Sequence, residues 1–318
     1  MRARAVLTVC TATLWYVGCA AVPAPAAKTF ATAPASFHEP ARLAIVGDMR
    51  DDRTFLGIGS NEDECRSVVN AIVADRPSLV VITGDLVFEA SKRDWLRFDD
   101  LTSPLRDNAI PVVAVMGNHE YRGSRVDAEG QFFARFPALD RHLWHTMDFG
   151  PTRMVFIDTT AEKLTASEWA EQRAWFERTL DDADRDDAVR GLIVLAHHPP
   201  YTNSVDADDG AAVRAAFVPA FMRSRKTLAY LAGHVHNYER FARGGKTFVV
   251  SGGGGAEPAR VALGAARRHP DDLFAGPALR PFHFIMYELG PTGLTAEVRA
   301  VPTGQPRRVI DRFDLRYP

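Results

Sequence analysis

Five short apolar runs alternate with stretches of helical periodicity through the middle of the chain. The runs have the length and apolar character of buried strands, and they cover residues 43–46, 79–82, 112–115, 192–195 and 228–231. Between them, amphipathic patterns predict helices, for example over 62–75 and 167–184. Strands that alternate with helices predict an α/β sheet covered by helices. Residues 282–315 instead have the pattern of consecutive strands joined by Gly-Pro turns, which predicts a second, partly antiparallel sheet packed on the first.

Each predicted strand of the first group ends in a polar signature. The side chains that follow the strands are Asp48, Asp85, the run Asn118-His119-Glu120, His197 with His198, and His234 with His236. In open α/β sheets, ligands bind in the crevice outside the carboxyl ends of the strands. We therefore expect two aspartates, one asparagine and four or five histidines to converge on one rim of the sheet.

These donors predict a transition-metal site. Carboxylate and amide oxygens together with imidazole nitrogens suit Fe, Zn, Mn or Ni better than calcium. A carboxylate in the middle of such a series can bridge two cations about 3.5–4 Å apart, as in two-metal hydrolases. His234 and His236 lie two positions apart after one strand, so one ring can serve each cation. No CxxC pair exists for a structural zinc site, and Cys65 is expected to be a core residue on a helix.

The charge balance restricts the partners. Lys and Arg total 38 against 40 Asp and Glu, which gives a formal net charge of -2. Such a balance provides neither the basic surface of a nucleic-acid-binding protein nor a polybasic membrane patch. The sequence also contains neither a G-x-S-x-G nucleophile elbow nor an H-E-x-x-H zinc-protease motif. The partner that remains is a small-molecule substrate.

The polar signatures resemble the motif blocks of a known family. GD (47–48), GDLVF (84–88), GNHE (117–120), AHHPPY (196–201) and AGHVHNYER (232–240) are similar to blocks of the calcineurin-like metallophosphoesterases, and most similar to those of purple acid phosphatases and their bacterial relatives. The resemblance implies a four-layer αββα sandwich of two mixed sheets flanked by helices, with the domain over residues 40–318. It also implies hydrolysis of phosphate esters, first of all monoesters, by a metal-bound hydroxide at a binuclear centre. A phosphodiesterase or nucleotidase of the same fold and a catalytically impaired phosphate-binding surface protein are the alternatives.

Carried over position by position, the resemblance assigns a role to each donor. The metal ligands would be Asp48 and His236 for the first cation, Asp85 as the bridge, and Asn118, His197 and His234 for the second cation. His119 would not bind metal. It would face the substrate phosphate, where it would stabilise charge or protonate the leaving group.

Two positions depart from the family pattern. Many phosphoesterases carry a histidine two residues after the first aspartate, where this chain has Arg50, and purple acid phosphatases carry a tyrosine where this chain has Phe88. The first metal therefore lacks its usual fourth protein ligand, which water or Asp51 or Asp52 would replace. Arg50 either binds the substrate phosphate, which its planar fork suits, or forms a surface salt bridge. His198 and Tyr201 are the other expected substrate contacts, with a plain loop role as the alternative for His198.

The N-terminal segment has the layout of a secretory leader. Arg2 and Arg4 precede an apolar stretch over 5–17, which is shorter than the roughly 20 residues of a membrane span. Gly18-Cys19 resembles a lipobox, in which Cys19 is lipidated and becomes the mature N-terminus; plain secretion with cleavage within 24–27 is the alternative. Residues 20–39 are rich in Ala and Pro and are expected to be a flexible tether. The expected location is periplasmic or at the cell surface, with a lipid anchor as the membrane contact.

Overall fold

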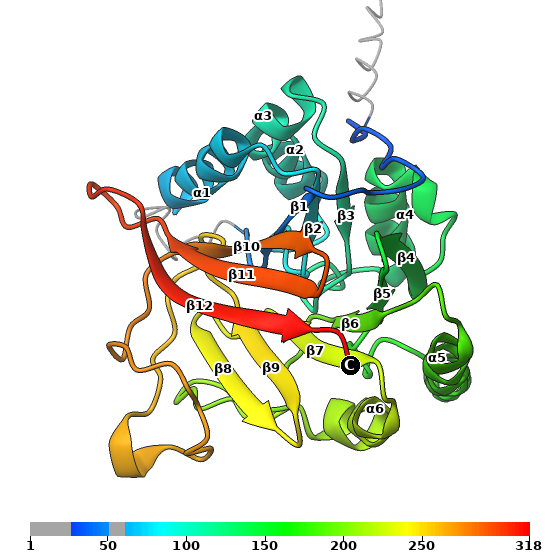
Figure 1. Ribbon diagram of the computed structural model, residues 1–318. Helices are drawn as coiled ribbons and strands as arrows, with labels where there is room; N and C mark the ends of the chain where they lie inside the picture. Colours follow the sequence, from blue (N-terminus) through cyan, green and yellow to red (C-terminus); the bar gives the residue numbers. More distant parts are fainter. Residues whose placement is uncertain (1–26, 51–60) are drawn as a thin grey trace, which may run out of the picture.

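The computed structural model describes residues 27–50 and 61–318 of the chain. It contains two six-stranded sheets (Figure 1). In order across the first sheet, the strands are β12 (Arg308–Arg316), β11 (Gly293–Ala300), β10 (His283–Gly290), β1 (Arg42–Val46), β2 (Leu79–Ile82) and β3 (Val112–Ala114). Across the second sheet they are β4 (His145–Phe149), β5 (Thr152–Phe156), β6 (Gly191–Leu195), β7 (Thr227–Ala232), β9 (Lys246–Ser251) and β8 (Tyr238–Arg243).

Both sheets are mixed. In the first, β1, β2 and β3 run parallel, while β10, β11 and β12 form an antiparallel meander that joins β1. In the second, β5, β6, β7 and β9 run parallel, and antiparallel strands β4 and β8 form the two edges. The five predicted strands correspond to β1, β2, β3, β6 and β7, and the predicted C-terminal strands are β10 to β12.

Helices cover the outer faces of the two sheets. Figure 1 shows one group on the side of the first sheet and a second group beside the second sheet. The first group is α1 (Glu62–Asp75), α2 (Lys92–Leu101) and α3 (Ser103–Asp107), and the second is α5 (Ala166–Arg185) and α6 (Ala211–Arg223). Helix α4 (Arg125–Arg135) and the short 3-10 turns Pro137–Leu139 and Gly264–Ala266 complete the described elements.

The side chains of β6 show why the sheets form a sandwich. Ile193 and Leu195 belong to the core between the sheets, whereas Leu192 and Val194 pack with residues of α5 and α6. Successive side chains of a strand point to opposite faces, so a strand that is apolar at every position must be covered on both faces. The predicted four-layer αββα sandwich is confirmed.

The segment expected to be a flexible tether is packed over much of its described part. The Phe30 ring stacks on Phe136 with centroids 5.4 Å apart, and Phe37 is 5% exposed and contacts Phe149. Ala31 forms a β-bridge with Pro111. The packed domain therefore begins well before residue 40, because two aromatic rings anchor a stretch whose small residues alone predicted a linker.

The predicted leader, Cys19, Asp51 and Asp52 lie outside the described residues. Within the described ranges, no helix has both the length and the apolar character that crossing a bilayer requires.

Candidate metal centre

The loops that follow β1, β2, β3, β6 and β7 meet at one rim of the sandwich. Asp48, Asp85 and His234 hold their backbones in the left-handed region, with φ of 60°, 54° and 69°. This conformation is unfavourable for residues with a side chain, and such strain clusters at functional sites. The amide of Asp48 donates to the carbonyl of Gly84 over 3.1 Å, which ties the first two loops together. A Cβ on Gly117 would collide with the carboxylate of Asp85, so only glycine allows this approach.

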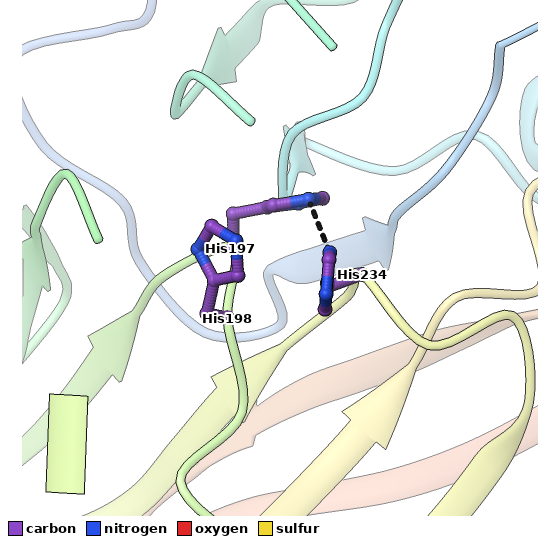
Figure 2. A group of neighbouring side chains, drawn as sticks. All are labelled: His197, His198 and His234. Carbon is purple, nitrogen blue, oxygen red and sulfur yellow. Dashed lines mark hydrogen bonds between the residues drawn. The ribbon is translucent and has the colours of Figure 1, made fainter. Parts of the chain in front are cut away.

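His197 is the central donor of the site. It is fully buried, and its Nδ1 lies 2.9 Å from the carbonyl oxygen of Thr83, which makes Nδ1 the protonated nitrogen. Its Nε2 then carries a lone pair. That atom lies 3.2 Å from Oδ1 of Asp85, 3.0 Å from Oδ1 of Asn118 and 3.2 Å from Nδ1 of His234. Figure 2 shows the His197 and His234 rings in contact.

The Nε2 atom of His197 and the three atoms around it form a set of potential metal ligands. The lone pair of His197 Nε2 faces two oxygens that are themselves acceptors, and Nδ1 of His234 lies 3.1 Å from the same Asn118 oxygen. Lone pairs that converge in this way are stabilised by a bound cation. One imidazole pair, one amide oxygen and one carboxylate oxygen match the preferences of Zn, Fe or Mn. The set predicted for the second metal is therefore assembled.

Burial keeps the site histidines neutral. It lowers the pKa of His197 well below its usual range and, with a contribution from His198, lowers the pKa of His234 to about 3. Neutral imidazole is the form that binds metal. The ring assignments and the protonation states therefore both favour ligation.

His198 is the second histidine of its block. Its Nδ1 lies 3.0 Å from the hydroxyl oxygen of Thr159, and its amide donates to the same oxygen over 2.9 Å. Its ring centroid is 4.3 Å from that of His234, and the ligand atoms of His197, His198 and His234 lie within 4.8 Å of one another (Figure 2). It does not line the cavity described below. Its placement supports a role beside the ligands more than the predicted contact with phosphate.

Asp48 and His236 lie beside the carboxylate of Asp85: ligand atoms of Asp48, Asp85 and His197 lie within 4.8 Å of one another. Both oxygens of Asp48 accept from the amide of His234, over 3.1 and 2.9 Å, and Nε2 of His236 is 3.7 Å from Asp48 Oδ1. Burial raises the pKa of Asp48 well above its usual range, and the neighbouring Asp85 raises it further. Two carboxylates buried this close together need positive charge between them.

Arg50 supplies positive charge at this place. Its Nε lies 3.3 Å from Oδ2 of Asp85, and its Nη2 lies 3.1 Å from Nε2 of His236. The Arg50 side chain is 11% exposed, so its charge is only weakly screened by solvent. Of the two roles expected for Arg50, the surface salt bridge does not fit this burial.

A cavity of about 260 Å³ opens onto these groups. Its wall includes Arg50, Asp85, Asn118, His119, Arg122, Ser204, Asp206, His234 and His236. His119 places Nδ1 2.7 Å from the carbonyl oxygen of Phe88 and Nε2 3.8 Å from Oδ2 of Asp85. Burial lowers the pKa of His119 to about 4, although Asp85 opposes this shift. A neutral His119 with Nδ1 bonded to the backbone presents Nε2 beside the cavity.

Two residues of the site were given no role from the sequence. Glu120 is fully buried, and its carboxylate accepts from the amides of Asp85, Leu86, Val87 and Gly117. It holds the β2 and β3 loops together, and its place in the GNHE block was the available signal. Arg122 lies two positions beyond that block; its guanidinium carbon is 5.1 Å from the centroid of the Phe88 ring and its side chain lines the cavity.

Tyr201, the other expected substrate contact, lies outside the cavity wall. Its ring contacts Phe248 and His269, and the guanidinium carbon of Arg243 is 3.8 Å from its centroid. It is not among the residues that line the cavity. This placement does not support the predicted substrate contact, because the ring packs against Phe248 of β9.

Comparison with known proteins gives a consistent result. The family described as calcineurin-like phosphoesterase matches residues 41–238. Purple acid phosphatase 23 of Arabidopsis thaliana is 26% identical over 271 residues, which cover 73% of this chain and 55% of that protein. An uncharacterized protein of Mycobacterium tuberculosis is 26% identical over 277 residues, which cover 77% of this chain and 48% of that protein. The chain spans about half the length of the curated relatives it matches.

The fold has solved counterparts. The structure of purple acid phosphatase PPD1 from yellow lupin seeds is similar with a TM-score of 0.67 at 23% identity, over 87% of this chain and 53% of that chain. At this level of identity the likeness supports the arrangement of the two sheets and their helices.

Proposed function

Because the chain belongs to the calcineurin-like phosphoesterase family, we propose that it hydrolyses phosphate esters at the candidate metal centre. The observation that carries the proposal is the convergence of Asp85, Asn118, His197 and His234 beside a cavity that also contains two arginines. A cation held by this set would supply a Lewis acid that polarises the phosphoryl oxygens and activates water as the nucleophile.

The chain's own residues would bind and orient the ester. Arg122 is exposed at the cavity wall, and its guanidinium can donate two parallel hydrogen bonds to phosphate oxygens. His119 lies at the same wall with Nε2 beside Asp85, where it would stabilise the developing charge or pass a proton to the leaving oxygen. The backbone carbonyl of Phe88 holds the ring in this orientation.

The charges around the cavity favour monoesters. A phosphomonoester carries a second negative charge near neutral pH that a diester lacks. Arg50 and Arg122 both line the cavity, so its wall carries two cationic side chains. The volume of about 260 Å³ is below the roughly 300–1,000 Å³ of pockets for drug-sized ligands. Both features support a small phosphomonoester as the substrate class.

The test compares esters on protein purified without chelators. We expect metal-dependent turnover of aryl and alkyl monoesters that exceeds turnover of bis-aryl diesters, is abolished by chelation and returns on adding metal. Asp85→Asn should reduce metal content and turnover, whereas Asp206→Asn, which changes a cavity-lining carboxylate outside the donor set, should retain the metal. Faster turnover of diesters would identify a phosphodiesterase, and phosphate binding without any turnover would identify the impaired binding protein.

A separate proposal concerns location. The leader pattern supports export and a lipid anchor at Cys19. Cys19→Ser should release the protein from the membrane fraction of an expressing cell or block its processing. A mature N-terminus beyond Cys19 in the unmodified protein would instead indicate plain secretion.

A further inference from the structure

The ligands expected for the first metal are occupied by a side chain of the protein. Nδ1 of His236 lies 2.7 Å from the carbonyl oxygen of Glu257, so it carries the proton and leaves the lone pair on Nε2. That lone pair faces Nη2 of Arg50 at 3.1 Å and accepts its hydrogen. The atom that would bind the first metal is thus engaged by a guanidinium.

The two oxygens of the Asp85 carboxylate have different partners. Its Oδ1 lies 3.2 Å from Nε2 of His197 and accepts from the amide of His119 over 3.1 Å. Its Oδ2 is the oxygen 3.3 Å from Nε of Arg50. One oxygen of the predicted bridge therefore faces the donor set of the second metal, and the other faces arginine.

A guanidinium at this place excludes a metal ion rather than binding one. Arginine has no lone pair to donate and keeps its charge at any pH that proteins tolerate. A divalent cation among Asp48, Asp85 and His236 would have to displace Arg50 or lie against a like charge. The backbone of Arg50 is also held in place, because Nδ2 of Asn61 donates to its carbonyl over 3.1 Å. The tyrosine ligand of purple acid phosphatases is missing as well, since the side chain of Phe88 has no oxygen.

We propose that the centre holds a single metal ion, bound by Asp85, Asn118, His197 and His234, and that the guanidinium of Arg50 takes the place of the other cation. Arg50 then offsets the negative charge of Asp48 and Asp85 at the cavity wall. This inference deepens the proposed function and rests on metal binding by the set around His197.

The first measurement is the metal content of the unmodified protein loaded with Mn²⁺ and freed of excess ion. We expect one ion per chain and an electron paramagnetic resonance spectrum with the hyperfine pattern of an isolated ion. Two tightly held ions with exchange-coupled spins would overturn the inference while leaving phosphate-ester hydrolysis intact. Absence of any bound metal together with absence of turnover would overturn the proposed function as well.

The second measurement uses variants at Arg50. Arg50→His restores an imidazole where the family pattern has one, so a second ion should bind and the spectrum should become that of a coupled pair. Arg50→Lys keeps the charge without adding a ligand and should stay at one ion. Arg122→His is the matched control, because it places a histidine on the same cavity at a position outside the predicted ligand set and should also stay at one ion. A second ion in Arg122→His or Arg50→Lys, or a second ion missing from a folded Arg50→His, would contradict the assignment.

Discussion

The backbone amide of Asp85 donates to Oε2 of Glu120 over 3.0 Å. The same carboxylate accepts from the amide of Gly117 over 2.6 Å, so one buried side chain connects the loop that carries Asp85 with the loop that carries Asn118. Burial raises the pKa of Glu120 to about 8, and the backbone donors oppose this shift. The relative positions of two predicted metal ligands therefore depend on a residue that binds no metal.

Glu120→Gln should loosen the site without removing a ligand. The new amide group would point a donor at backbone donors, and an unsatisfied buried pair of this kind costs about 1–3 kcal/mol in the free energy of unfolding. We expect a lower midpoint of urea unfolding and weaker metal retention on dialysis. Glu288→Gln is the control, because that carboxylate is 57% exposed and its ion pair with Arg42 is long at 3.5 Å. Unchanged stability and metal retention in Glu120→Gln would contradict the positioning role.

The two adjacent histidines of the fourth block should differ in their effect on metal content. His197 directs Nε2 at Asp85 and Asn118, whereas His198 is hydrogen-bonded to Thr159 through both its ring and its amide and does not line the cavity. His197→Ala should therefore lose the metal and His198→Ala should retain it, as measured by elemental analysis of the purified variants. Metal retained in His197→Ala and lost in His198→Ala would exchange the two roles.

His119→Ala should discriminate between leaving groups. A residue that protonates the leaving oxygen matters most when the alcohol is a poor leaving group, and general-acid catalysis contributes about 10²–10⁴-fold. We expect kcat/KM to fall by that factor on alkyl phosphates and by less on an aryl phosphate with an acidic phenol, with metal content unchanged. Equal losses on both esters with the metal intact would indicate charge stabilisation, and loss of metal would make His119 a ligand.

Stability at acidic pH should depend on Glu168, which lies in the first turn of α5. Its two oxygens accept from Arg125 over 2.9 and 2.6 Å, and its Oε2 also accepts from the amide of Thr165 in a capping box. The hydrogen bonds from Arg125 lower the pKa of Glu168 from the ordinary glutamate value of 4.5 to about 2 in the folded protein. A lowered folded-state pKa stabilises the fold at every pH above the unfolded value and loses this effect as the pH falls toward the folded value.

Glu168→Gln should therefore reduce the free energy of unfolding by about 1 kcal/mol at pH 7. The difference between variant and unmodified protein should shrink as the pH is lowered from about 4.5 toward 2. Urea unfolding at a series of pH values measures this, with Glu171→Gln, an exposed change on the same helix, as the control. A difference that does not vary with pH would assign the effect to helix capping alone.

Much of the site was predictable from local sequence. The five apolar runs became β1, β2, β3, β6 and β7, and the polar residues after them converge at one rim. The family resemblance drawn from those blocks is confirmed. The two aromatic anchors at Phe30 and Phe37 were missed, because composition describes a segment without showing which surface lies beside it.

The sequence by itself determined the alternation of strands and helices and which polar residues follow the strands, since strand periodicity is local and parallel strands bring their carboxyl ends to one edge. Only the tertiary structure decided where the guanidinium of Arg50 lies. Its place after β1 was compatible with a surface salt bridge and with a phosphate contact, and its hydrogen-bond partner His236 lies 186 positions away in the chain. The local sequence does not determine whether a long cationic side chain points to solvent or into the site. The buried carboxylates and the lone pair of His236 determine where the charge of Arg50 is most stable.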